Sequence, residues 1–332
     1  MDLPLLAACL LLFALAMYVM LDGFDLGVGM LLLVQPEQRV RNQMVDAIAP
    51  TWDGNETWLV LAALTLLAGF PRAYGILVPA FYVPIILMIL SLGLRGVSFE
   101  FRHNSASARR RWDAVFAGGS LVAALAQGLI VGGLIQGVDS DLDSFGGSPL
   151  DTFSPLCLLT ALTVVTGYAT LGVGWLRLKG DDATRAFARR HQQWIPLAFL
   201  GLAIGTGVFA ATVQPRFAVT WQDQRVPLSL SVLVLAGCAL SIAWLARRTD
   251  ADDRLGFGLA LAMMLSAVAT LDLSLFPNIV PFRVTVWQAA SEASSQAFLL
   301  VGALVVTPVI LAYSAFAYRV FRGRTPSEGW YS

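Results

Sequence analysis

Two acids and three glycines interrupt a long apolar run near the start of the chain, in the stretch Met20-Leu21-Asp22-Gly23-Phe24-Asp25-Leu26-Gly27-Val28-Gly29. On membrane-insertion scales, one carboxylate at the centre of a spanning helix costs roughly 2.5–3.5 kcal/mol, and two cost about twice that. Asp22, Asp25 and Gly29 are spaced so that they share one helical face with Tyr18. We therefore expect a helix that lies inside a bundle with its acids turned inward.

The same run carries a GxxxG pair, Gly23 and Gly27, on an adjacent face. Small residues at this spacing let two membrane helices approach closely. The run from Pro4 to Val34 has 31 residues, more than the roughly 20 that one crossing needs. The alternative interpretation is therefore that both acids lie past the span, in the cytoplasmic headgroup zone.

The composition of the whole chain is typical of a membrane protein. Of its 332 residues, 57% are hydrophobic and 13% are charged, 22 basic residues balance 22 acidic ones, and the mean hydropathy is +0.70. Soluble domains carry about 25% charged residues. These figures exclude a disordered chain, an ordinary soluble domain and a nucleic-acid binder driven by positive charge. We expect an all-α integral membrane protein that forms one polytopic domain.

Nine apolar stretches are long enough, or nearly so, to cross a bilayer as helices, in which every backbone polar group bonds within the segment. The expected spans are Pro4–Val34, Asp53–Phe70, Gly75–Arg95, Ala114–Gly137, Phe153–Arg177, Gln192–Val213, Val226–Leu245, Leu255–Phe276 and Ala297–Tyr318. Basic residues set the orientation, because cytoplasmic loops are enriched in Lys and Arg. One set of connections carries only Arg72, Arg216, Arg225 and Arg283, and the other set carries the remaining 18 of the 22. The sequence therefore predicts an N-terminus outside the membrane and a C-terminus in the cytoplasm.

Acids also mark the second and third spans. Asp53 and Glu56 open the second span, where a capping box, with Asp53 as N-cap and Glu56 three residues later, would explain both. The third span ends near Arg95 and Glu100. Arg95 can pair with Glu100 or with the earlier acids, and the alternative is a snorkelling arginine beside a solvated glutamate.

The predicted topology brings these ends of the first three spans to the cytoplasmic face. The acids expected to converge there are Asp22, Asp25, Asp53, Glu56 and Glu100. We expect Arg95 and Asn55, with Trp52 and Trp58, to be their charge and packing partners. Because protonatable groups within reach of one another can pass protons through waters, this cluster indicates a proton entrance. A proton- or ion-coupled transporter, or a scaffold whose acids only brace helices, would use the same residues.

The chain offers no evident redox centre of its own. His103 and His191 fall in cytoplasmic connections, so a pair of histidines cannot ligate haem across the bundle. Cys9, Cys157 and Cys238 lie far apart without a CxxC motif, so we expect neither a disulfide framework nor a metal site.

Three motifs together resemble subunit II of the cytochrome bd-type quinol oxidases. They are Asp22-Gly23-Phe24-Asp25-Leu26-Gly27-Val28-Gly29, Pro50-x-Trp52-Asp53-Gly54-Asn55-Glu56-x-Trp58 and Arg95-Gly96-x-x-Phe99-Glu100-Phe101-Arg102. The resemblance covers essentially the whole chain. In its compact length, and in having Glu56 rather than a glutamine at that position, the chain resembles the cyanide-insensitive branch of the family.

The resemblance implies a heterodimer in the bacterial inner membrane. Subunit I of such an oxidase carries the haems, two of b type and one of d type or b only, together with the quinol site. The complex oxidises quinol and reduces O₂ to water with protons from the cytoplasm, so turnover is electrogenic without pumping. Subunit II ligates no cofactor or metal. Whether it binds a quinone or lipid, and whether a small single-helix accessory subunit joins, the resemblance leaves open.

The resemblance also implies a fold and a site. The fold has two four-helix bundles, residues 1–137 and 152–277, followed by a ninth helix over residues 297–320. In this family the aspartate of the second helix, here Asp53, belongs to a proton path toward the oxygen-reducing haem of subunit I. Asp25 and Glu100 occupy matching acid positions.

Overall fold

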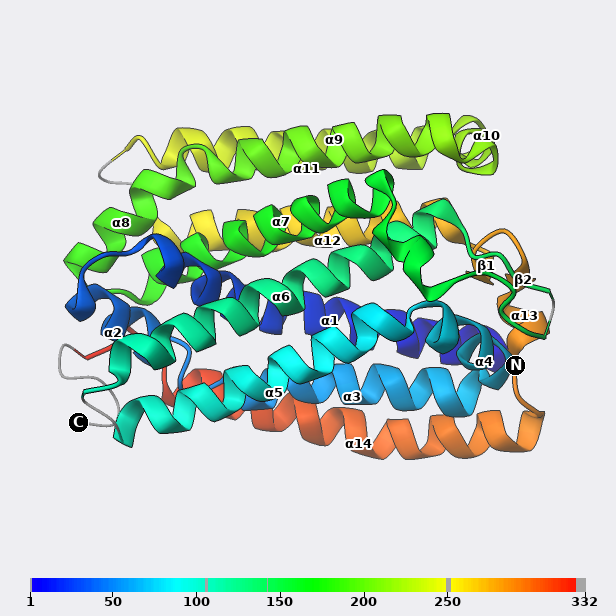
Figure 1. Ribbon diagram of the computed structural model, residues 1–332, viewed down its shortest axis with the longest axis horizontal. Coiled ribbons are helices and arrows are strands. Elements are labelled where there is room, and N and C mark those ends of the chain that lie inside the picture. The colour runs from blue at the N-terminus through cyan, green and yellow to red at the C-terminus, as the bar shows by residue number, and fades with distance from the viewer. Residues whose placement is uncertain (1, 105–106, 142, 249–251, 327–332) are drawn as a thin grey trace.

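The computed structural model describes residues 2–104, 107–141, 143–248 and 252–326, and they form an elongated bundle of helices (Figure 1). The elements in chain order are α1 (Leu3–Leu31), η1 (Leu32–Val34), α2 (Gln38–Asp46), α3 (Trp52–Gly69), α4 (Pro71–Ala80), α5 (Tyr82–Asn104), α6 (Arg109–Gln136), η2 (Pro149–Phe153), α7 (Pro155–Lys179), α8 (Asp182–Gln192), α9 (Ile195–Val213), α10 (Pro215–Asp223), α11 (Arg225–Leu245), α12 (Asp253–Leu275), β1 (Asn278–Val280), β2 (Val284–Thr285), α13 (Val286–Ala289) and α14 (Ala293–Val320). The predicted all-α fold is confirmed. β1 and β2 form only a short antiparallel hairpin.

Eight of the described helical segments are long and apolar enough to cross a membrane. Each corresponds to a predicted span. The remaining predicted span is α3, an 18-residue helix that packs against α1 and α14 but opens with a polar first turn. The count of nine crossings and the division into 1–137, 152–277 and 297–320 stay predictions.

The third predicted span differs from the structure, because it is divided into α4 and α5 at Phe81. Pro84 explains the break. It has no backbone N–H to donate to the carbonyl of Ala80, and its ring crowds that carbonyl. The helix that carries Arg95 therefore begins at Tyr82 and continues past the predicted end to Asn104.

The short helices gather at the two ends of the bundle (Figure 1). One end holds α2 and α8, and the opposite end holds α4, α10, α13 and the β1–β2 hairpin. α1 begins at the hairpin end, and α14 finishes at the α2 end. The connections that carry most of the basic residues therefore share one end, as the alternation in the sequence predicts.

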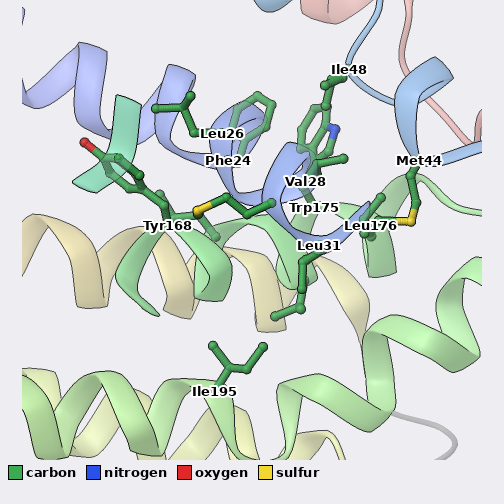
Figure 2. Close-up of a cluster of buried hydrophobic side chains, with 14 of the residues drawn as sticks. Phe24, Leu26, Val28, Leu31, Met44, Ile48, Tyr168, Trp175, Leu176 and Ile195 are labelled. Atoms are coloured by element: carbon green, nitrogen blue, oxygen red, sulfur yellow. The ribbon is translucent and has the colours of Figure 1, made fainter. Parts of the chain in front are cut away.

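The core lies where α1 meets α7. The GxxxG prediction is confirmed, since a Cβ on Gly27 would lie 1.9 Å from the carbonyl oxygen of Tyr168. Next to this contact, Phe24 stacks on Trp175 with ring centroids 4.3 Å apart (Figure 2). The Trp175 indole also donates to the carbonyl of Ala47, 2.9 Å away, in the segment between α2 and α3. This core therefore fixes the acid-bearing part of α1 relative to the start of α3.

Candidate functional site

Arg95 is the centre of the site. Its side chain is only 1% exposed, and Nη2 lies 2.6 Å from Oδ1 of Asp22 and also bonds to Glu56. The guanidinium is 6.0 Å from the ring centroid of Trp52. One arginine of α5 thus joins acids from α1 and α3, as the pairing with the earlier acids predicts. A snorkelling Arg95 is wrong, because its side chain is buried and paired, and so is a pairing of Arg95 with Glu100 in place of these acids.

Asp25 forms the deeper part of the site. It is fully buried, and its Oδ2 accepts a hydrogen bond from Nδ2 of Asn55, 2.7 Å away. Its other oxygen has no hydrogen-bond partner. Asp22 is also fully buried, so both acids are turned into the bundle as the spacing predicts, while their depth relative to the headgroup zone stays a prediction.

Negative charge exceeds positive charge in this cluster. Asp22 and Glu56 contact the one guanidinium, and Asp25 lies beside them on Asn55. One oxygen of each aspartate, and Nε and Nη1 of Arg95, are buried without a hydrogen-bond partner. An unpaired charge in a low-dielectric interior costs several kcal/mol. The cluster is therefore suited to bind protons, and Glu56, whose side chain is 26% exposed, is its most accessible acid.

The capping-box interpretation of Asp53 and Glu56 is wrong. The N-cap of α3 is Thr51, which makes no side-chain capping bond, and Asp53 already lies inside the first turn. Asp53 is exposed but close enough to Glu56 for their charges to interact. Its side chain therefore lies outside the arginine cluster and beside its accessible acid.

Glu100 is also exposed, one and a half turns beyond Arg95 on α5. The structure thus brings together three of the five predicted acids and leaves Asp53 and Glu100 on outer faces of α3 and α5. Of the predicted aromatic partners, Trp52 packs against Phe99, with centroids 5.3 Å apart. Trp58 is fully buried on α3 and packs edge-on against Phe13.

A second buried ion cluster lies at the α2 end of the bundle and was not predicted from the sequence. Asp113 of α6 accepts from Arg102 at 2.5 Å and from Gln38 at 2.9 Å, and lies 3.5 Å from Arg41. In the sequence, Asp113 directly follows a run of three arginines and a tryptophan and looks like part of a solvated turn. Its burial arises because α2 folds back onto α5 and α6.

A third polar cluster, a chain of hydrogen bonds between three side chains, extends from the acids into the apolar bundle. The Tyr168 hydroxyl donates to Oε1 of Gln127 at 2.6 Å, and the amide nitrogen of Gln127 donates to the Tyr18 hydroxyl at 2.8 Å. Tyr18 lies one turn before Asp22, on the face that the spacing predicts. The signal in the sequence that could have indicated this chain of hydrogen bonds is Gln127, an amide inside an apolar run.

Two shallow clefts border the acid site where α14 meets α7 and the start of α3, each with a cavity volume of about 10 Å³. Both are lined by Pro50, Thr51 and Tyr318. The Tyr318 hydroxyl donates to Oδ1 of Asn55, 3.0 Å away. Among the side chains that the structure describes, no group of three or more His, Cys, Asp or Glu is arranged to hold a metal ion.

The whole chain is similar to known oxidase subunits. Residues 3–321 match the family model for cytochrome bd terminal oxidase subunit II. The chain is 29% identical to cytochrome bd-I ubiquinol oxidase subunit 2 of Escherichia coli strain K12, over 94% of this chain and 92% of that one. It is 27% identical to cytochrome bd ubiquinol oxidase subunit 2 of Bacillus subtilis, over 92% of each chain.

A solved structure shares the fold. A chain of the bd oxidase from Geobacillus thermodenitrificans superposes with a TM-score of 0.78 at 16% identity, over 97% of this chain and 99% of that one. The family match extends from the first helix to the end of α14 and includes all three acid-bearing elements. The chain therefore belongs to the cytochrome bd terminal oxidase subunit II family.

Proposed function

We propose that this chain pairs with a haem-bearing subunit I and conducts protons from the cytoplasm toward the site of oxygen reduction. The complex would oxidise quinol and reduce O₂ to water, as the names of the Escherichia coli and Bacillus subtilis relatives suggest. Because the protons would be taken from one side of the membrane, turnover would be electrogenic without pumping. The chain would lie in the bacterial inner membrane with its C-terminus in the cytoplasm.

The observation that carries the proposal is the excess of buried carboxylates around Arg95. Two acids contact one arginine in an apolar bundle, and a third, Asp25, is buried beside them with one oxygen that has no partner. A cluster that served only to brace helices would be more stable with balanced charge. Surplus acids at membrane depth are instead typical of proton relays.

The exposure of the acids suggests an order for the path. Asp53 is exposed beside Glu56, Glu56 is partly exposed and bonded to Arg95, and Asp22 and Asp25 are fully buried. Protons would therefore enter near Asp53 and Glu56 and reach Asp22 and Asp25 last. Glu100, exposed on α5, would serve at the entrance or at the surface shared with subunit I.

Of the two histidines, only His191 has a described side chain, and it lies on the short helix α8 at one end of the bundle. Nδ1 of His191 lies 2.9 Å from the carbonyl oxygen of Phe187, and the ring packs against the Phe187 ring. The side chain of His103 lies outside the described residues. We assign the haems to subunit I, as the family resemblance implies. We also expect the two bundles, 1–137 and 152–277, and the helix over 297–320 to pack against that subunit and lipid.

The test is the purified heterodimer with Asp25→Asn or Asp53→Asn, and with Asp223→Asn as a matched control at the opposite end of the bundle. We expect quinol-dependent O₂ uptake to fall in the first two while the haem absorbance per complex stays normal. A scaffold role predicts loss of haem and of assembly instead. Ion flux by this chain alone in liposomes would favour a transporter, and unchanged O₂ uptake in both variants would reject the path.

A further inference from the structure

We propose that Tyr318 of α14 is a positioning residue that holds the Asn55 amide with its nitrogen toward Asp25. This inference rests on the proposed function, because it concerns how one acid of that path is prepared. It gives α14, which packs mainly against α1 and α3, a specific part in the site.

The hydrogen bonds define the arrangement. The Asn55 nitrogen lies 2.7 Å from Oδ2 of Asp25, and its oxygen lies 3.0 Å from the Tyr318 hydroxyl. The same nitrogen is 3.4 Å from the carbonyl oxygen of Leu21, a group that can only accept. A flipped amide would direct its oxygen at that carbonyl and at Asp25, so the network itself assigns the orientation.

Asn55 and Asp25 are buried, and the Tyr318 hydroxyl is the one described donor to the Asn55 oxygen. Removing the Tyr318 hydroxyl leaves the Asn55 oxygen without its donor, and the amide is then held at one end only. Asp25, which already has one oxygen without a partner, depends on that amide for its only described hydrogen bond. Its geometry and its exchange of protons should therefore respond to a change on α14.

Tyr318 is itself held in place from two directions. Its ring meets Trp175 of α7 edge-on, with centroids 6.1 Å apart, and Trp175 is bonded to the segment before α3. On its other side it lines both clefts at the junction of α3, α7 and α14. Phenylalanine can keep the ring contacts, so Tyr318→Phe removes the hydroxyl and little else.

The experiment compares Tyr318→Phe with Tyr313→Phe in the purified heterodimer. Tyr313 lies on the same helix at the rim of one cleft, and it is 62% exposed. Since a hydrogen bond of this kind contributes about 0.5–1.5 kcal/mol, Tyr318→Phe should lower kcat for quinol oxidation about two- to tenfold with an unchanged KM. Tyr313→Phe should match the unsubstituted enzyme.

Two further measurements separate positioning from a merely structural effect. The first is the redox-difference infrared band of the Asp25 carboxyl, identified by its loss in Asp25→Asn, which should change frequency in Tyr318→Phe alone. The second is a double-mutant cycle, in which Tyr318→Phe should add nothing to Asn55→Ala. An unchanged band, or additive losses in the cycle, would overturn the proposal.

The outcomes also distinguish this inference from the proposed function. If Asp25→Asn lowers O₂ uptake but Tyr318→Phe does not, the positioning role fails and the proton path stands. If Asp25→Asn, Asp53→Asn and Tyr318→Phe all leave O₂ uptake unchanged, both proposals fail.

Discussion

At the scale of single residues, Arg95 decides which acids form the site. The five positions from Arg95 to Glu100 turn a helix by about 140° net, so an inward-facing Arg95 already implies an outward-facing Glu100. That part of the arrangement could be predicted from spacing. The choice of Glu56 over Asp53 could not, because it depends on the rotation of α3 against α1, which long-range packing sets.

Arg95→Met should strongly destabilise the protein. It leaves Asp22 fully buried without its countercharge, and breaking a buried pair on one side costs about 3–5 kcal/mol. Thermal unfolding of the purified complex in detergent measures the loss. The exposed pair between Arg72 and Asp143 is the control, because Arg72→Met should cost only about 0–1 kcal/mol. Equal losses in the two variants would contradict the central role of Arg95.

At the scale of helices, close contact between α1 and α7 fixes the position of the α1 acids within the bundle. The backbones meet at Gly27 and Gly172, where Cβ atoms would overlap the facing chain. The GxxxG spacing predicted this contact, but it did not identify α7 as the partner. The partner is set by the fold, since α1 also packs on α3 and α6.

Gly27→Ala should push α1 away from α7. Its new methyl group would lie 1.9 Å from the Tyr168 carbonyl oxygen, a backbone atom that cannot rotate away. We expect a loss of about 1–3 kcal/mol in unfolding free energy, typical of overpacking. Gly93→Ala is the matched control, because no atom outside its own helix backbone lies within 4 Å of its added methyl group. The idea fails if both variants melt at the same temperature in a thermal scan.

The ion cluster at Asp113 should hold α2 in place. Asp113→Asn removes the charge that two arginines share, so the attachment of α2 to α6 weakens while the bond from Arg102 to Asn42 remains. Hydrogen exchange should therefore accelerate in α2, with little change in α9, which lies across the bundle. Exchange that accelerates equally in both helices would indicate global destabilisation instead of local release.

At the scale of the whole molecule, the sequence predicts the fold class and the distribution of charge better than it predicts the number of membrane crossings. The exclusion of a soluble fold follows from the composition, and the gathering of the basic connections at one end follows from their alternation along the sequence. The number of crossings does not, because α3 is as long as a short span yet places Asp53, Asn55 and Glu56 in its first turns. These residues make α3 a weak span by hydropathy and at the same time supply the site.

The orientation of the bundle is testable with two engineered cysteines. Glu37→Cys lies at the start of α2, and Gln222→Cys lies on α10 at the opposite end, both at exposed positions in a Cys9→Ser background. Because the basic connections gather at the α2 end, Glu37→Cys should react with an impermeant maleimide only in inverted vesicles. Gln222→Cys should react only in spheroplasts. The reverse pattern would put the accessible acids Glu56 and Asp53 on the outside, and protons for oxygen reduction would then have to come from there.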